Sequence, residues 1–293
     1  DEAVADLKRV KANLKRYKTA VLKAAVEGKL TEDWRKQHPN IEPANKLLDR
    51  ILAERREKWN GRGKYKEPSS PNSSLVPILP KGWVLATAEQ CTSVITDGEH
   101  ITPQRSPSGV LLLSARNVLD GRLSLADVDY VPRSEYDRIA KRVVINPGGV
   151  LLSCSGTVGR STVAPEKLIF TLVRSVAVLK PLAGMGKYLS IALRSPGLQE
   201  QVSEKKTQTA QANIFQGKIK TLVFPLPPLT EQQNIGAEVE RRLSVIDELE
   251  VTVKSNLTRA ERMRQSILSA AFSGRLAVSK SEIARQANNL VAH

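Results

Sequence analysis

Apolar residues recur every seven positions at the start of the chain. Two such series run three or four positions apart, which places both on one face of an α-helix and is typical of a coiled-coil seam. The series are Leu7, Leu14 and Val21, and Val10, Tyr17 and Ala24. Gly28 follows as the expected C-terminal stop. The pattern therefore predicts a long helix that packs against a partner helix.

The segment after Gly28 predicts a turn, a second helix and a linker. Trp34, Pro39 and Pro43 lie in the turn, and residues 44–59 (ANKLLDRILAERREKW) have the periodicity of a helix. Residues 61–78 are rich in proline and serine, a composition typical of linkers. We therefore expect a helical region over residues 1–60 and a linker over residues 61–78.

Between residues 79 and 228 the heptads give way to short apolar runs separated by Gly, Pro and Asp. Runs of this length with turn residues between them predict strands. They are Leu111–Leu113, Val143–Ile145, Val150–Leu152, Val176–Leu179 and Leu222–Phe224. A helical stretch near 186–204 is interrupted by Pro196. The pattern predicts an α+β globular domain of short strands and helices over residues 79–228.

Heptads return after residues 225–233 (PLPPLTEQQ), where Thr230 is the expected N-cap and Gln233 completes a capping box. We expect a helix over residues 229–276 and a tail over residues 277–293. A helix of about forty residues is roughly 60 Å long, more than a globular core needs, so it requires a partner. We expect it to pair antiparallel with the first heptad helix, with pairing to another subunit as the alternative. The expected coiled-coil and subunit-docking positions are Leu7, Leu14, Val21, Val239, Ile246, Val253 and Ile267.

One helix signature occurs twice, near the two ends of the chain. Residues 17–30 read YKTAVLKAAVEGKL and residues 263–276 read MRQSILSAAFSGRL. Leu, Ala, Ala, Gly and Leu coincide at a fixed offset, and each copy ends a heptad helix with Gly, a basic residue and Leu. A globular segment between two matched helices suggests a spacer that carries a reading module.

The charge of the chain indicates a polyanionic partner. The formal net charge is +15, and residues 1–66 carry 18 basic against 10 acidic side chains. Nucleic acid is the simplest partner for such a surface, although a basic surface can also serve solubility alone. Aromatic residues are only 4% of the chain, so there is little on which to stack single-stranded bases. This favours double-stranded DNA.

The sequence carries no pattern of an enzyme or of a metal site. Phosphate-loop and dinucleotide-binding glycine motifs are missing, and the three histidines stand apart from any cysteine pair. We therefore expect no catalytic residue, no metal and no cofactor on this chain, although an active site can be assembled from distant residues. Cys91 and Cys154 are expected to be free thiols of a cytosolic protein, and no membrane span or signal peptide is visible. Because the chain starts at Asp1, already inside a heptad, we expect it to be part of a longer product.

Polar loops between the predicted strands supply the side chains that read DNA. Arginines at 105, 116 and 174 are candidates for base or phosphate contact, and amides at 117, 208, 211 and 213 for adenine edges. Lysines 205 and 206 are expected to bind phosphates. The glycines of residues 155–160 could let backbone amides approach a phosphate, and a plain hairpin turn explains them about as well. Taken singly, each loop is more often solvated surface. The full candidate set is His100, Arg105, Ser114, Arg116, Asn117, Ser155, Thr157, Arg160, Arg174, Lys205, Lys206, Gln208, Gln211 and Asn213.

These stretches together resemble the specificity subunit of Type I restriction–modification enzymes. The likeness covers nearly the whole chain and rests on the order and spacing of several motifs. They are LPKGW at 79–83, DGEH at 97–100, SARNV at 114–118, SCSGTVG at 153–159, RSVA at 174–177, PLPPLTEQ at 225–232 and the two helix endings. The resemblance implies two target-recognition domains separated by two conserved coiled-coil helices. Each domain would read one half of a split DNA site, and each half would be about three to four base pairs long.

The resemblance also implies the partners. The helix pair would dock two methyltransferase (modification) subunits, which bind S-adenosylmethionine, and a motor–nuclease subunit would join them. Only one recognition domain is visible here, so either the other lies outside this chain or a half-length subunit self-associates and reads a palindromic split site. Two other interpretations remain: the recognition part of a fused methyltransferase–nuclease whose catalytic part is missing, and a coiled-coil scaffold with an incidental basic surface.

Overall fold

A computed structural model describes residues 2–59, 63–71 and 78–273 of the chain. The chain divides into two compact units: residues 1–18 together with 242–293, and residues 19–241. The expected tail over 277–293 lies outside the described residues, as does part of the expected linker. No described helix is long and apolar enough to cross a membrane.

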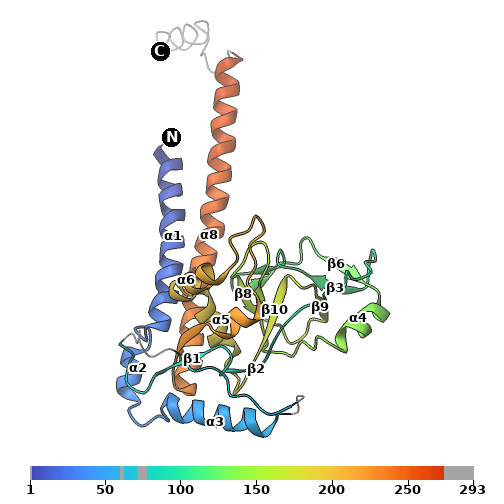
Figure 1. The fold of residues 1–293 in the computed structure, drawn as a ribbon. Helices are drawn as coiled ribbons and strands as arrows, with labels where there is room; N and C mark the ends of the chain where they lie inside the picture. The colour runs from blue at the N-terminus through green and yellow to red at the C-terminus, as the bar shows by residue number, and fades with distance from the viewer. Residues whose placement is uncertain (1, 60–62, 72–77, 274–293) are drawn as a thin grey trace, which may run out of the picture. The chain divides into compact units, whose positions relative to one another are not determined.

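The first unit pairs the outer parts of two long helices, α1 (Glu2–Val26) and α8 (Leu229–Phe272). These parts run side by side in opposite directions, so the predicted antiparallel pairing is confirmed (Figure 1). The Lys18 Nζ donates to Asp247 Oδ1 at 2.6 Å and to Glu250 Oε2 at 2.7 Å, which ties the two helices together.

Only one of the two predicted heptad series of α1 is covered. Leu14 is buried against α8, where Ile246 and Val253 are buried too, and Leu7 is half-buried. Val10 and Tyr17 are instead 42% and 48% exposed, so the prediction that they share the seam is wrong. A pair of helices needs only a narrow stripe, and the second series lies beside it.

The far end of α8 carries apolar side chains that no described residue covers. Ile267, predicted as a seam residue, is 52% exposed, and Phe272 is 90% exposed. Met263 and Leu268 are exposed as well. The seam of the described helix pair therefore stops before Ile267.

In the second unit, a buried carboxylate joins the segment that follows α1 to the start of α8. Glu231, in the first turn of α8, is fully buried. It accepts hydrogen bonds from Thr31 Oγ1 at 2.6 Å and from Trp83 Nε1 at 2.8 Å. It also forms an ion pair with Arg35 at 2.9 Å. These donors compensate the burial of the charge. The helix α8 begins at Leu229, so Thr230 lies inside its first turn. The Pro228 carbonyl accepts from the Gln232 N–H, and the predicted capping role of Thr230 is therefore wrong.

Gly28 ends α1 in the left-handed region, with φ of 71°. A Cβ at this position would lie 2.5 Å from the Pro80 ring and 2.7 Å from the Arg35 guanidinium. Only glycine combines this backbone conformation with such close packing. The chain then continues through α2 (Glu32–Gln37) and α3 (Ala44–Glu57).

The strands of the second unit form a four-stranded sheet, a three-stranded sheet and two strand pairs. The four-stranded antiparallel sheet has the order β2-β10-β7-β8, and the three-stranded sheet has the order β6-β3-β9, with β3 and β9 parallel. Pairs form between β1 and β11 and between β4 and β5. The strand bounds are β1 Val84–Thr87, β2 Thr92–Asp97, β3 Val110–Leu113, β4 Val118–Leu119, β5 Arg122–Leu123, β6 Asp129–Val131, β7 Val150–Ser153, β8 Ser161–Val163, β9 Phe170–Leu172, β10 Val176–Pro181 and β11 Val223–Leu226.

Four helices complete this α+β unit, and the predicted fold class is confirmed. They are α4 (Arg133–Ala140), α5 (Gly186–Arg194), α6 (Pro196–Lys205) and α7 (Gln216–Lys220). Pro196 starts α6 and so splits the helical stretch as predicted. Val143–Ile145 is coil instead of the predicted strand, because Asn-Pro-Gly-Gly at 146–149 turns the chain there, although Val143 still joins the core. That core packs buried residues of β3, β7, β9 and β10 against Ile139 of α4.

Candidate nucleic-acid interface

The turn at Arg174 and Ser175, between β9 and β10, is the point where three predicted loops meet. The Arg174 N–H donates to the Glu99 carbonyl at 3.0 Å. The Ser175 hydroxyl oxygen accepts from the Ala115 N–H at 3.0 Å, and its carbonyl accepts from the Cys154 N–H at 2.9 Å. Loops that begin at positions 97, 114 and 154 of the sequence are therefore held against one turn, with the exposed Arg174 among them.

The loop after β7 is joined to the segment after α6. The Gly156 N–H donates to the Ala212 carbonyl at 3.0 Å, and Ser155 forms an isolated bridge with Asn213. The Gln211 Nε2 donates to the Ser155 hydroxyl at 3.2 Å. These contacts bring the predicted residues of 155–160 and 205–213 together, across more than fifty positions of sequence.

Of the two interpretations of the glycines in this loop, the structure fits the plain turn and not the approach of a phosphate. The Gly156 N–H is taken by Ala212, and the Gly159 N–H donates to the Ser153 carbonyl at 2.9 Å. Both glycines have positive φ, so they serve the shape of the turn. The exposed side of this loop is supplied by Thr157, with Arg160 half-buried beside it.

The amide side chains predicted to read adenine differ sharply in their positions. Asn117 is 1% exposed: its Oδ1 accepts from the Ser114 N–H, and its Nδ2 donates to the carbonyls of Ser124 and Asp127. It holds a turn together and has no free edge for a base, so the predicted contact from Asn117 does not fit. Asn213 is half-buried and donates to the Gln211 carbonyl, whereas Gln208 and Gln211 are exposed.

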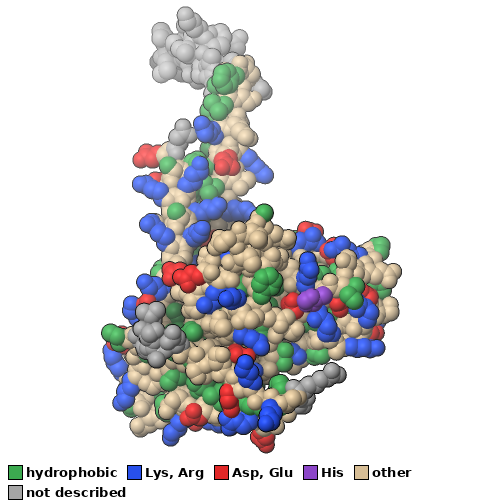
Figure 2. Space-filling view, viewed as in Figure 1, with side chains coloured by type: hydrophobic (Ala, Val, Ile, Leu, Met, Phe, Trp, Pro, Cys, Tyr) green, Lys and Arg blue, Asp and Glu red, His purple; other side chains and the backbone are tan. Residues whose placement is uncertain are grey.

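The basic side chains and hydroxyls of the candidate set lie mostly at the surface. Lys205 ends α6 and Lys206 follows it, and both are half-buried. Ser114 is half-buried against Asn117. Basic side chains are spread over the visible face of the strand-bearing unit, with acidic ones among them instead of one uninterrupted patch (Figure 2). Acidic groups placed among basic ones reduce the local positive potential, so the charge of this face is mixed.

Two of the arginines share one carboxylate. The Arg105 Nε lies 3.3 Å from Asp129 Oδ2, and the Arg116 guanidinium lies 3.0 Å from the same oxygen. Arg116 also approaches Asp127 at 3.5 Å. All of these side chains remain partly exposed. Both guanidinium groups therefore stay at the surface in defined positions.

The loop at 97–100 is fixed by buried and half-buried acids. Glu99 is 5% exposed and faces Arg138 at 3.4 Å and Arg142 at 3.9 Å. Burial by itself would raise the pKa of the Glu99 carboxyl, but the Ile101 N–H and the two guanidinium groups outweigh it, and the pKa lies below its ordinary value. The charged Glu99 thereby anchors the loop that carries His100.

Residues missed by the sequence interpretation lie beside His100. Asp97 lies 3.0 Å from His100 Nε2 and accepts from Gln216 Nε2 at 2.5 Å. Phe215, just before α7, is 64% exposed, and Ile101 is 66% exposed. Exposed apolar side chains in a polar, basic surface can contact thymine methyl groups or wedge between bases. In the sequence, Phe215 directly follows Ile214 in an otherwise polar segment, and only this position could have pointed to it.

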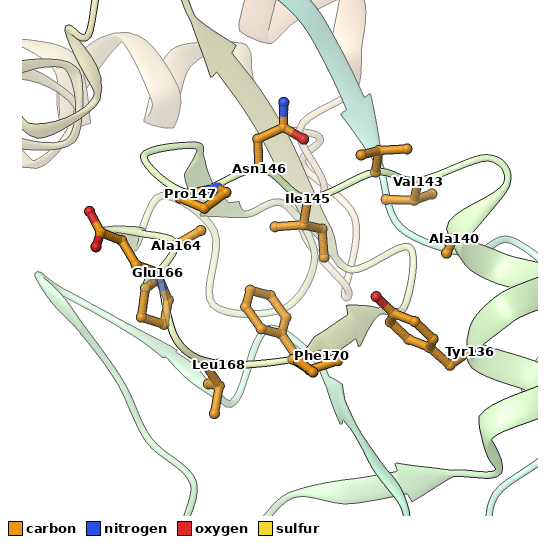
Figure 3. A pocket seen from close by; sticks show the side chains of 13 residues that line it. Tyr136, Ala140, Val143, Ile145, Asn146, Pro147, Ala164, Glu166, Leu168 and Phe170 are labelled. Atoms are coloured by element: carbon orange, nitrogen blue, oxygen red, sulfur yellow. The ribbon is translucent and has the colours of Figure 1, made fainter.

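A separate cavity of about 200 Å³ lies between α4 and the turns around residues 146 and 165 (Figure 3). Phe170, Ile145 and Leu168 face it, with Tyr136 at one side. None of the predicted site residues lines it. Asn146 and Glu166 add polar side chains to its lining.

The two cysteines of the chain lie in its interior. Cys91 and Cys154 are free and buried, and burial raises the pKa of each thiol to about 12, which keeps them protonated. Among the described residues, no group of three His, Cys, Asp or Glu side chains could hold a metal ion.

Comparison with known proteins supports the resemblance drawn from the motifs. Residues 137–259 match the family model described as the Type I restriction modification DNA specificity domain. The chain is 26% identical, over 94% of its length, to the EcoBI specificity subunit of Escherichia coli, and 28% identical over 94% to the EcoKI specificity subunit of Escherichia coli strain K12. It covers 53% and 52% of those proteins, so it spans about half the length of these curated relatives.

A solved structure supports the fold. It comes from a study of complex assembly and conformational transition of the type I R-M system. The likeness has a TM-score of 0.53 at 19% identity and covers 92% of this chain and 60% of the other. At this level of identity the likeness bears on the fold alone.

Proposed function

We propose that this chain, a relative of the Type I specificity subunits, is a non-catalytic DNA reader that recognises one half of a divided duplex site. The observation that carries the proposal is the convergence of four separate loops on the Arg174–Ser175 turn and on one another. Their residues are far apart in sequence, and the chain as a whole is basic. A rigid platform that presents several loops is how a fold reads base edges.

Within this surface, the geometry supports a division of roles. Arg105, Arg116 and Arg174 keep exposed guanidinium groups that match the acceptor pair of guanine. The exposed amides of Gln208 and Gln211 suit adenine. Lys205 and Lys206 would bind phosphates and position the duplex.

The remaining candidates act differently. Ser155, Thr157 and Arg160 supply the rim of the loop after β7, His100 lies beside Asp97, and Phe215 adds an apolar contact. Asn117, Ser114 and Asn213 hold the loops in shape through their hydrogen bonds. Their substitution would disturb recognition through the fold of the loops.

The paired helices α1 and α8 would dock methyltransferase subunits. In this proposal those partners bind S-adenosylmethionine and transfer the methyl group, and a motor–nuclease subunit joins the assembly to cut. The chain itself recognises the DNA sequence and binds no cofactor. Residues 1–60 and 229–276 would serve as conserved helical regions on either side of a recognition domain at 79–228, linked through 61–78.

The relatives do not favour a fused methyltransferase–nuclease, since both are separate specificity subunits by name. Self-association as a half-subunit remains part of the proposal. Sedimentation of the purified chain, with and without duplex, distinguishes a monomer from a symmetric pair.

The test is selection from duplexes with a randomised central segment, using the full chain alone and mixed with a Type I modification subunit. We expect enrichment of a short motif, with phosphate-type salt dependence. Methyl transfer is expected only in the mixture. Methyl transfer by the chain alone, or binding without any sequence preference at moderate salt, would contradict the proposal.

A further inference from the structure

Asp129 lies between two arginines that come from different parts of the chain. Its Oδ2 is 3.3 Å from Arg105 Nε and 3.0 Å from the Arg116 guanidinium. The Asp129 side chain is 30% exposed, against 59% for Arg105 and 46% for Arg116. The carboxylate is therefore the innermost member of the cluster, and the two cations stand outside it.

The backbone around this cluster is fixed by the sheet. Asp129 pairs with Leu112 in the β3–β6 ladder, and the Ser106 N–H donates to the Tyr130 carbonyl at 3.0 Å, which anchors the loop of Arg105. The loop of Arg116 is anchored where the Ala115 N–H donates to the Ser175 hydroxyl. What remains free is the direction of each long side chain, and Asp129 is the group that both guanidinium groups contact.

One carboxylate between two guanidinium groups changes how they meet DNA. It offsets their mutual repulsion, so both can stay close together, and it reduces the rotamer freedom that each would lose on binding. Its negative charge also opposes a phosphate that approaches the same spot, while a neutral base edge is not repelled.

We propose, on the basis of the proposed function, that Asp129 is a positioning residue that makes Arg105 and Arg116 read bases instead of phosphates. Asp127 has a minor part, because it is 81% exposed and lies 3.5 Å from Arg116. Asp129 touches no base itself; it acts through the two arginines.

The test compares D129N with D137N in the full chain. Both substitutions remove one carboxylate charge that pairs with an arginine, but Asp137 pairs with Arg133 one turn away on α4. The probes are a duplex enriched by selection on the wild-type chain and a scrambled duplex of the same composition. Binding to each is measured across a salt series, with thermal unfolding as the check on folding.

For D129N we expect the preference for the selected duplex over the scrambled one to fall about tenfold or more, the size of one lost bidentate contact. The scrambled duplex should bind more tightly to D129N than to the wild type. The salt dependence of this binding should be steeper by about one phosphate contact. D137N should keep the wild-type preference, and D129E should recover part of it.

Equal changes for both duplexes in D129N, or a preference that stays as in D137N, would overturn the inference while leaving the proposed function intact. If D129N unfolds, D129S, which also removes the carboxylate and keeps a polar side chain, carries the same comparison. A wild-type chain that selects no sequence at all would remove the proposed function and this inference with it.

Discussion

The repeated helix signature has two different environments in its two copies. In the first copy, Val21 is 2% exposed and Ala25 is fully buried. Their counterparts at the fixed offset are Ile267, which is 52% exposed, and Ala271, which is exposed too. Val26 is 9% exposed and its counterpart Phe272 is 90% exposed. The same pattern forms a helix in both places, but only one copy has its apolar face covered by described residues.

What covers the first copy is a set of residues far away in sequence. Gly28 packs against Pro80 and Trp83, and Trp83 donates to the buried Glu231. The signature thus encodes an apolar helix face, and the residues that cover this face come from other parts of the chain. Residues 274–276 of the second copy lie outside the described part of the chain.

The largest expected effect on stability is at Glu231, the buried carboxylate among the residues that cover the first copy. Glu231→Ala would leave Arg35 half-buried without its partner, and Thr31 and Trp83 without their acceptor. We expect the free energy of unfolding to fall by about 3–5 kcal/mol, measured by urea denaturation. Glu240→Ala, which removes an exposed carboxylate paired with Lys187, should cost less than about 1 kcal/mol. Equal costs would mean that Glu231 does not hold the first copy in place.

A smaller effect separates the covered seam from the uncovered end of α8. Leu14→Ala removes a buried side chain and should destabilise the chain by about 2–3 kcal/mol. Ile267→Ala removes an exposed one and should change the free energy of unfolding by less than about 0.5 kcal/mol. Thermal unfolding at several protein concentrations measures both. A large, concentration-dependent loss in Ile267→Ala would show that the second copy is covered by self-association in solution.

The smallest expected effect concerns Lys18, at the start of the first copy. Burial lowers its pKa, but the hydrogen bonds and charges of Asp247 and Glu250 outweigh this and hold the pKa above 10.5. Its stabilisation is therefore fully present below pH 10.5 and is lost as the pH rises through the raised value of the folded state. Lys18→Met should cost about 0.5 kcal/mol at neutral pH.

The Lys18→Met variant also tests the expected direction of the pH dependence. The difference in unfolding free energy between wild type and Lys18→Met should shrink as alkaline pH passes the raised pKa. A difference that grows with pH would contradict the assigned ion pairs. Lys36→Met, which removes an exposed lysine paired only within α2, is the matched control and should change stability less.

The sequence by itself determined the long helices and some of the strands, because periodicity and turn residues are local signals. The strands β1, β2, β8 and β9 and the helices α4 and α7 were not predicted, and the predicted turn around Trp34 contains the helix α2. Heptads predicted α1 and α8, and Pro196 predicted the break before α6. The loops of the candidate interface were also identified, since polar runs between strands are visible without any structure. The predicted strand at Val143–Ile145 was wrong, because an apolar run can enter a core without pairing as a strand.

Tertiary structure alone decided which of these residues face outward and which loops meet. Asn117 and Gln211 are both polar amides in loops, yet one is buried in a hydrogen-bonded turn and the other is exposed. Val10 and Leu14 belong to equally good heptad series, and only the position of α8 distinguishes them. The contact of Ser155 with Asn213 and the arginine pair on Asp129 join residues from separate strands and loops. Such contacts depend on strand order and on the packing of distant elements, which no local pattern specifies.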